Sequence, residues 1–174
     1  MEKVAVFGKP GSGKSTLSKL LSSSLDLPLH QLDSLVYKAN GEPVDKETFR
    51  LAHSDILSSD AWIIDGLGPL GSFNERLEAA DTLIYIDLPY PVSYWFVTKR
   101  LLKGFMIKPE GWPDGSSVLK GSIQSYKMLK LSPTFWNDEF ELRLKSQSEF
   151  KKVHIIKSKA ELRHFIQHHV KLKR

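Results

Sequence analysis

The stretch "GKPGSGKST", residues 8–16, decides the fold of this chain. It matches the phosphate-binding pattern G-x-x-x-x-G-K-[ST] in full, and its flanks are those that the pattern requires. The apolar run "VAVFG" (4–8) before it predicts a buried strand, and leucines at helical spacing after it predict a helix over 15–25. A glycine-rich turn between a strand and a helix directs backbone N–H groups and the helix dipole at a polyphosphate. The sequence therefore predicts a site for a nucleoside triphosphate.

Two side chains of this phosphate-binding loop, or P-loop, have specific predicted roles. Lys14 reaches the β- and γ-phosphates, and the Ser15 hydroxyl is a ligand for Mg²⁺. The alternative is an ordinary glycine-rich turn that matches by chance, and the matching strand and helix argue against it. The expected nucleotide-binding residues are Gly8, Pro10, Gly11, Ser12, Gly13, Lys14, Ser15 and Thr16.

The composition places this site in one globular domain over residues 1–174. Hydrophobic residues make up 41% of the chain and charged residues 26%, and the lack of cysteine excludes disulfides and cysteine chemistry. No segment has the pattern of a signal peptide or a membrane span, so a cytoplasmic protein without a membrane partner is expected. Of the 25 Lys and Arg, 17 follow residue 98, against 7 of the 20 Asp and Glu. This asymmetry fits an anionic ligand, either nucleotide or nucleic acid, or else a solvated basic surface.

The order of the predicted elements indicates an α/β protein. Strand patterns alternate with helix patterns, which favours a parallel sheet with helices on both faces. Strands are expected over 4–8, 27–32, 61–65, 82–88 and 152–157, and helices over 15–25, 45–59, 74–80, 91–103, 118–131 and 135–149. Asp45 is expected to be the N-cap of the helix over 45–59. A last helix begins at "SKAE" (158–161), where Ser158 and Glu161 form a capping box. The segment 103–117, rich in glycine and proline, is either a lid over the site or an ordinary connection.

Several stretches of the chain carry a family resemblance. They are "VFGKPGSGKSTL", "LPLHQLD", "ETF", "WIIDG", "RLEAADTLIYIDLP" and, in the looser part after residue 101, "KSKAELRHFI". Through them the chain resembles the small P-loop kinases known as DNA topology modulation proteins (FlaR-like), which are relatives of adenylate kinase. The resemblance implies a P-loop NTPase fold of three layers, α/β/α, with a five-stranded parallel sheet in the order 2-3-1-4-5. The lack of an Asn-Lys-x-Asp motif argues against a Ras-type GTPase.

The resemblance also implies an activity. It is the transfer of the γ-phosphate of ATP, with Mg²⁺, to a small-molecule acceptor, which is a nucleotide or another metabolite. The alternative is a nucleotide-binding regulator of DNA topology that binds nucleic acid through its basic C-terminal half. The sequence determines neither the acceptor nor the oligomeric state.

Carboxylates follow the second, third and fourth strands, at the edge where open parallel sheets bind ligands. Asp33 is a candidate for orienting or deprotonating an acceptor hydroxyl, or else it closes a turn. Asp65 is expected to hold Mg²⁺ through water and, with Gly66, to face the acceptor. Asp87 competes for the metal, but the likeness to adenylate kinase favours Asp65 and leaves Asp87 as a structural cap before Pro89.

Three arginines are candidates for phosphate contacts, because a planar guanidinium suits phosphate oxygens. Arg100 falls where adenylate kinases begin their lid and sense the donor phosphates. Arg76 matches the arginine of the family's R-L-x-x-A-D stretch, and Arg50 lies on the helix where related nucleotide kinases contact the acceptor phosphate. Each can instead be a surface residue paired with a glutamate. The predicted catalytic residues are Lys14, Asp33, Arg76 and Arg100.

Overall fold

The computed structural model describes residues 1–37, 42–104 and 118–170. Within these residues, five strands form one parallel sheet in the order β2-β3-β1-β4-β5. The predicted parallel sheet and its strand order are therefore confirmed. The strands are β1 (Lys3–Gly8), β2 (Leu29–Gln31), β3 (Trp62–Asp65), β4 (Thr82–Ile86) and β5 (Lys152–Ile156).

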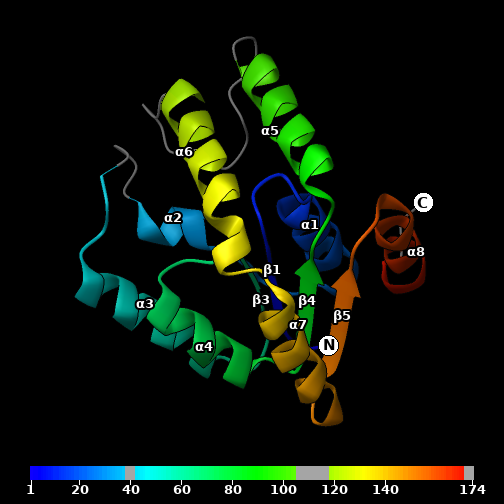
Figure 1. Ribbon diagram of the computed structural model, residues 1–174. Helices are drawn as coiled ribbons and strands as arrows, with labels where there is room; N and C mark the ends of the chain where they lie inside the picture. The colour runs from blue at the N-terminus through cyan, green and yellow to red at the C-terminus, as the bar shows by residue number, and fades with distance from the viewer. Residues whose placement is uncertain (38–41, 105–117, 171–174) are drawn as a thin grey trace.

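Helices cover both faces of the sheet, so the molecule has three layers (Figure 1). On one face lie α1 (Lys14–Leu25) and α8 (Lys159–His169), which bury Leu17, Leu21 and Phe165 against the sheet. The other face is covered by α3 (Lys46–Ser58), α4 (Leu70–Ala79) and α7 (Asp138–Ser146), which contribute Phe49, Phe73 and Leu144 to a second apolar cluster. Apolar burial on both faces explains why the central strands are continuous hydrophobic runs.

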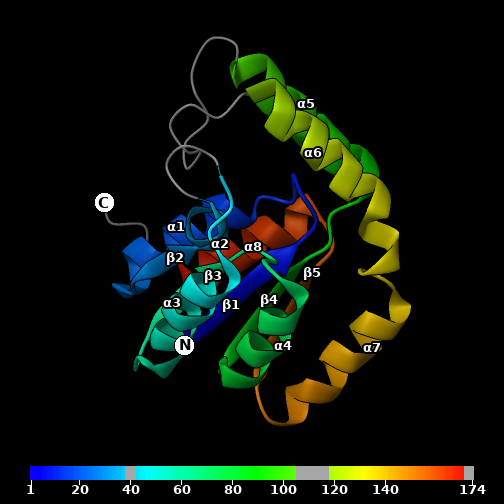
Figure 2. The ribbon, with the colours of Figure 1, turned by 90° about the vertical axis from the view of Figure 1, so that its left-hand side faces the viewer.

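Two long helices lie side by side beyond the edge of the sheet at which the strands end (Figures 1 and 2). They are α5 (Tyr90–Gly104) and α6 (Val118–Leu131), and we call them the α5–α6 arm. The hydroxyls of Thr98 and Tyr126 lie 2.6 Å apart, and the rings of Tyr94 and Tyr126 stack with centroids 6.0 Å apart. These contacts hold the two helices of the arm together.

The predicted helix caps are present. The Asp45 side chain accepts a hydrogen bond from the N–H of Thr48 at 2.9 Å and begins α3. At α8, the N–H of Glu161 donates to the Ser158 hydroxyl at 3.1 Å, and the Glu161 carboxylate accepts from the N–H of Lys157 at 2.8 Å. Both caps depend on residues a few positions apart, which is why the sequence alone predicts them.

The structure differs from the prediction at three places. The second strand ends at Gln31, and a short helix, α2 (Leu32–Val36), follows it; five residues are too few to give a helical period in the sequence. The α4 helix begins at Leu70, directly after Pro69, rather than at 74. The helix expected over 135–149 is α7, flanked by 3₁₀ turns at Ser132–Thr134 and Gln147–Glu149.

The predicted lid, 103–117, lies outside the described residues from 105 onward. None of the helices that the structure describes has the length and apolar character needed to cross a membrane.

Candidate functional site

The P-loop connects β1 to α1 and lies against the chain that joins β4 to α5. A Cβ atom added to Gly8 would lie 2.2 Å from the carbonyl oxygen of Ile86, and one added to Gly11 would lie 2.4 Å from that of Ser93. Both glycines also have positive φ angles, 138° and 71°. Any other residue at either place would force the backbone to move. Backbone packing therefore requires these two glycines, independently of any ligand.

The beginning of α1 has the geometry expected of a phosphate site. Gly13 is the N-cap residue, and no side chain caps it. An α-helix leaves the N–H groups of its first turn without partners inside the helix, and its dipole is positive at that end. Ser15 and Thr16 are exposed in this turn, whereas Ser12 is buried and Pro10 is half-buried. Of the predicted nucleotide-binding residues, Ser15 and Thr16 are therefore the ones that this turn exposes most.

Lys14 lies half-buried at the first residue of α1. Its Nζ donates a hydrogen bond to the carbonyl of Lys9 at 3.2 Å. Burial lowers the pKa of Lys14; the carboxylates of Asp65 and Asp33 oppose this shift, and the Arg100 guanidinium adds to it. Charges shift a pKa in this way only when they are close. The structure therefore brings four predicted residues into one cluster: Lys14, Asp33, Asp65 and Arg100.

Asp65 is the last residue of β3 and is only 5% exposed. Burial raises the pKa of its carboxyl group, while the charge on Lys14 and hydrogen bonding with Ser15 act in the opposite direction. Its Oδ1 has no hydrogen-bond partner within the described residues. Mg²⁺ prefers oxygen ligands such as carboxylates, hydroxyls and water. Asp65 and Ser15 therefore fit the predicted magnesium site.

Asp33 lies in the first turn of α2 and is exposed. The buried Leu32 anchors this helix at the end of β2, which places Asp33 beyond the strand as predicted, but on a helix rather than in a turn. The charge of Asp33 acts on the pKa of both Lys14 and Arg100. An exposed carboxylate near two cations can accept a hydrogen bond from the hydroxyl of a bound molecule.

Arg100 lies on α5 and is half-buried. Its Nη2 donates a hydrogen bond to the Ser125 hydroxyl of α6 at 2.6 Å. Burial lowers the pKa of Arg100, and the carboxylate of Asp33 opposes this shift. The α5–α6 arm therefore supplies a cation to the same cluster as the P-loop.

Arg76 is buried in α4, with 1% of its surface exposed. Its Nη2 donates a hydrogen bond to the carbonyl of Leu67, and its Nη1 lies beside Gly68. Burial lowers its pKa to about 10, and Glu75 opposes the shift. The guanidinium thus lies under the turn 66–69, which begins at Gly66. The predicted contact of Arg76 with a phosphate stays a prediction, because in this structure the side chain supports the turn.

Arg50 lies apart from the cluster, on the surface of α3. Its side chain is 64% exposed, and its Nε and Nη2 donate to the carboxylate of Glu47 at 3.0 and 2.7 Å. This pairing raises the pKa of Arg50. The arrangement is the surface ion pair that the sequence leaves open as the alternative to an acceptor contact.

One charged contact of the P-loop is not predictable from the sequence. Asp87 was expected to be a structural cap before Pro89, but its carboxylate forms an ion pair with Nζ of Lys9. The pair engages Asp87, whereas Asp65 lies next to Lys14 and Ser15, so the geometry favours Asp65 for the metal. No motif signals the Lys9–Asp87 contact, because Lys9 occupies a variable position of the phosphate pattern.

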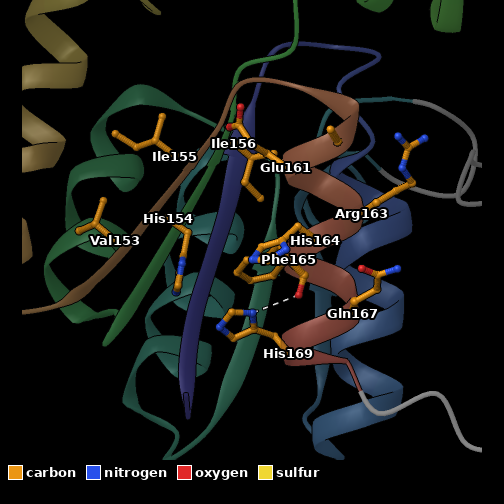
Figure 3. A pocket seen from close by; sticks show the side chains of 11 residues that line it. Val153, His154, Ile155, Ile156, Glu161, Arg163, His164, Phe165, Gln167 and His169 are labelled. Carbon is orange, nitrogen blue, oxygen red and sulfur yellow. Dashed lines mark hydrogen bonds between the residues drawn. The ribbon is translucent and has the colours of Figure 1, made fainter.

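An open groove lies elsewhere, between β5 and α8 (Figure 3). His154 of β5 and Phe165 and His169 of α8 line it, and the Nδ1 of His169 hydrogen-bonds with the Phe165 carbonyl at 3.0 Å. None of the four clustered residues lines this groove. In the part of the chain that the structure describes, no group of three His, Cys, Asp or Glu is placed to hold a metal ion.

Comparison with known proteins gives one match in sequence. No protein-family model matches the chain. A curated shikimate kinase from Aquifex aeolicus (strain VF5) is 30% identical over 104 residues, which cover 52% of this chain and 62% of that protein. The matched part therefore spans less than two thirds of the relative. The narrower resemblance to the DNA topology modulation proteins stays a prediction.

Comparison with solved structures tests the fold. A shikimate kinase from Acinetobacter baumannii in complex with shikimate aligns with a TM-score of 0.54 at 15% identity, over 97% of this chain and 90% of that chain. The crystal structure of the shikimate kinase from Aquifex aeolicus VF5 gives 0.42 at 18% identity, over 83% and 97%. With the strand order and the P-loop, the first alignment shows that the chain has the P-loop NTPase fold, with three layers, α/β/α.

Proposed function

We propose that the protein is an ATP-dependent phosphotransferase, which moves the γ-phosphoryl group of ATP to a hydroxyl of a small molecule. The observation that carries this proposal is the gathering of Lys14, Asp65, Asp33 and Arg100 at the end of the sheet where the P-loop lies. A P-loop alone binds nucleotide, but two carboxylates and a second cation beside it provide groups for an acceptor as well. The partial match to a shikimate kinase supports the same class of reaction.

The donor side takes ATP and Mg²⁺. The glycine-rich loop and the first turn of α1 would hold the phosphates, and the metal would be held by the Ser15 hydroxyl and, through water, by Asp65. Mg²⁺, when bound, offsets the negative charge that builds up on the phosphate oxygens during transfer.

The cations of the cluster have separate tasks. Lys14 has three N–H donors, so its Nζ would bind an oxygen of the β- or γ-phosphate while one donor stays on the Lys9 carbonyl. Arg100 reaches the cluster from the α5–α6 arm, so it would stabilise the transferred group from the other side. Both side chains are partly buried, and lower exposure to water strengthens their interaction with phosphate.

Asp33 is the group that we assign to the acceptor hydroxyl. The hydroxyl oxygen forms the new bond to phosphorus, the bond between the γ-phosphorus and the bridging oxygen breaks, and ADP leaves. The proton of the hydroxyl passes to Asp33 or to solvent. Such a base contributes about 10²–10⁴-fold in rate, and positioning and charge neutralisation supply the rest.

Shikimate is the first acceptor to test, because the sequence relative is named a shikimate kinase and one aligned structure holds shikimate. Nucleoside monophosphates and other hydroxylated metabolites are the next. No observation on the described residues favours the alternative of a nucleic-acid-binding regulator.

The proposal is tested by ADP release in the presence of a panel of acceptors. We expect one acceptor to raise ADP release well above the basal hydrolysis of ATP, with the product confirmed by mass spectrometry. Lys14→Ala should abolish this rate, whereas Lys46→Ala, which removes an exposed lysine at the beginning of α3, should not. A flat ADP rate over shikimate, nucleotides and hydroxylated metabolites would contradict the proposal.

A further inference from the structure

Lys9 is 3% exposed, although a lysine is seldom buried without a partner. Its Nζ forms an ion pair with Oδ1 of Asp87, which directly follows β4 and is 26% exposed. The ring centroid of Tyr90 lies 4.0 Å from the same Nζ. A charge that is removed from water needs such partners, because an isolated buried charge is costly. The P-loop therefore contains a buried ion pair, Lys9–Asp87, that phosphate binding does not require.

The same part of the chain supports the P-loop at further points. Gly8 and Gly11 approach the backbone so closely that a Cβ atom would not fit at either place. The N–H of Asp87 donates to the carbonyl of Ile156 at 2.8 Å, so the partner of Lys9 is itself fixed to the neighbouring strand β5. The P-loop thus rests on residues 86–93, which end β4 and begin α5.

Lys9 also contacts the predicted catalytic lysine. Its carbonyl accepts the hydrogen bond from Nζ of Lys14 at 3.2 Å. Lys9 is therefore connected by its side chain to the beginning of α5 and by its main chain to Lys14. Arg100 lies on α5, about 15 Å farther along the helix than Tyr90. Lys9 thus connects Lys14 to α5, the helix that carries Arg100, and the proposed reaction needs both of these cations.

We propose that Lys9 and Asp87 are a positioning pair, whose contact fixes the P-loop against α5 so that Lys14 and Arg100 approach the same phosphoryl group. The inference rests on the proposed phosphotransferase function. Neither Lys9 nor Asp87 needs to touch the nucleotide; the pair acts through Lys14 at one end and through Arg100 at the other. Without the pair, the P-loop keeps its glycines and N–H groups but can shift relative to α5.

Loss of the pair is expected to affect the chemical step more than the binding of nucleotide. The backbone N–H groups of the loop hold ATP with or without the pair, whereas a small displacement of Lys14 from Arg100 disturbs the transfer. In Lys9→Met we expect kcat to fall about 10–100-fold, with the KM for ATP changed by less than about threefold. Lys9→Arg keeps the charge beside Asp87 and should recover most of kcat.

A double-mutant cycle distinguishes positioning from a general loss of stability. If Lys9 acts through the alignment of Arg100, then Arg100→Met lowers kcat much less in the Lys9→Met protein than in the wild type. A merely structural role gives a lower Tm with independent effects on kcat. As a matched control, Lys145→Met removes the contact of the exposed Lys145 with Glu141 on α7, which keeps its second partner Lys157, and should leave kcat within about twofold of wild type.

Independent effects of Lys9→Met and Arg100→Met on kcat would overturn the inference, and so would an unchanged kcat in folded Lys9→Met. If Lys9→Met does not fold, Asp87→Glu decides the question, because it keeps both charges and moves the carboxylate by one methylene. A reduced kcat with a normal KM in Asp87→Glu supports the pair, and an unchanged kcat overturns it. If the wild-type protein shows no acceptor-dependent ADP release, the proposed function itself is wrong. If Lys14→Ala is inactive and Lys9→Met is fully active, only the positioning pair is wrong.

Discussion

The buried guanidinium of Arg76 donates a hydrogen bond to the carbonyl of Leu67, in the turn that connects β3 to α4. The turn begins directly after Asp65, so the arginine holds the chain that leaves the proposed metal site. Its Nη1 has no hydrogen-bond partner in the described residues, and its Cζ lies 5.5 Å from the ring centroid of Phe73. Arg76 therefore supports the turn 66–69, which we propose forms one wall of the acceptor site.

Replacing Arg76 should weaken both the fold and the acceptor site. In Arg76→Ala the Leu67 carbonyl loses its donor and a cavity opens in α4, so we expect the free energy of unfolding to fall by about 2–4 kcal/mol. The KM for the acceptor should rise more than the KM for ATP if the turn 66–69 faces the acceptor, as we propose. Urea denaturation and steady-state kinetics measure the two effects. An equal rise in both KM values would contradict this account of the turn.

Asp65→Asn should separate activity from stability. The amide keeps the shape of the side chain but is a poor partner for Mg²⁺, so we expect kcat to fall by about 10²-fold or more. Burial raises the pKa of Asp65, which means that the folded state holds its charged form at a cost. The neutral amide should therefore leave the free energy of unfolding unchanged or raise it by about 1 kcal/mol at pH 7.

Removal of the metal is the matched test for Asp65. EDTA should lower the activity of the wild type to the level of Asp65→Asn, and added Mg²⁺ should restore the wild type alone. An Asp65→Asn protein that keeps the activity and the magnesium dependence of the wild type would exclude this residue from the metal site.

Stability should decline in mild acid because of His154. Burial, His169 and Lys152 all lower the pKa of this histidine, which packs against Phe165 in the groove of Figure 3. The unfolded chain then binds the proton more readily than the folded chain, so stability is present above the unfolded pKa of about 6.5 and is lost as the pH falls below it. A single titrating group changes the free energy of unfolding by at most about 1.4 kcal/mol per pH unit, and the partial exposure of His154 keeps the loss below that limit.

Urea denaturation at a series of pH values between about 7 and 5 checks this dependence. His154→Gln should flatten the decline, whereas His168→Gln, which replaces an exposed histidine of α8, should not. An equally steep decline in His154→Gln would assign the effect to other groups.

Arg50→Ala decides between the two interpretations of that residue. The structure shows an exposed guanidinium paired with Glu47 on its own helix, so we expect no measurable change in Tm and a KM for the acceptor within about twofold of wild type. A rise of about tenfold or more in that KM alone would show that Arg50 leaves Glu47 to bind the acceptor.

The sequence predicts the local features of this protein well and the long-range contacts poorly. The P-loop and the caps at Asp45 and Ser158 depend on residues that are close in the chain, so a pattern reveals them. The pairing of Lys9 with Asp87 joins residues 78 positions apart and matches no motif. The burial of Arg76 depends on how α4 packs against the turn that precedes it. An arginine in a helical segment looks the same in the sequence whether it faces water or the core.

Asp33 gives the sharpest test of the proposed acceptor side, because this exposed carboxylate acts on the pKa of both Lys14 and Arg100. Asp33→Asn keeps the size of the side chain but removes the acceptor of the hydroxyl proton, so we expect kcat for phosphoryl transfer to fall by about 10²–10⁴-fold. The affinity for ATP, measured by calorimetry, should stay within about threefold, because the P-loop is unchanged. Asp60→Asn, at an exposed position before β3, is the control and should alter neither quantity. If Asp33→Asn weakens ATP binding as much as it lowers kcat, Asp33 serves the donor rather than the acceptor, and the hydroxyl must be activated by another group.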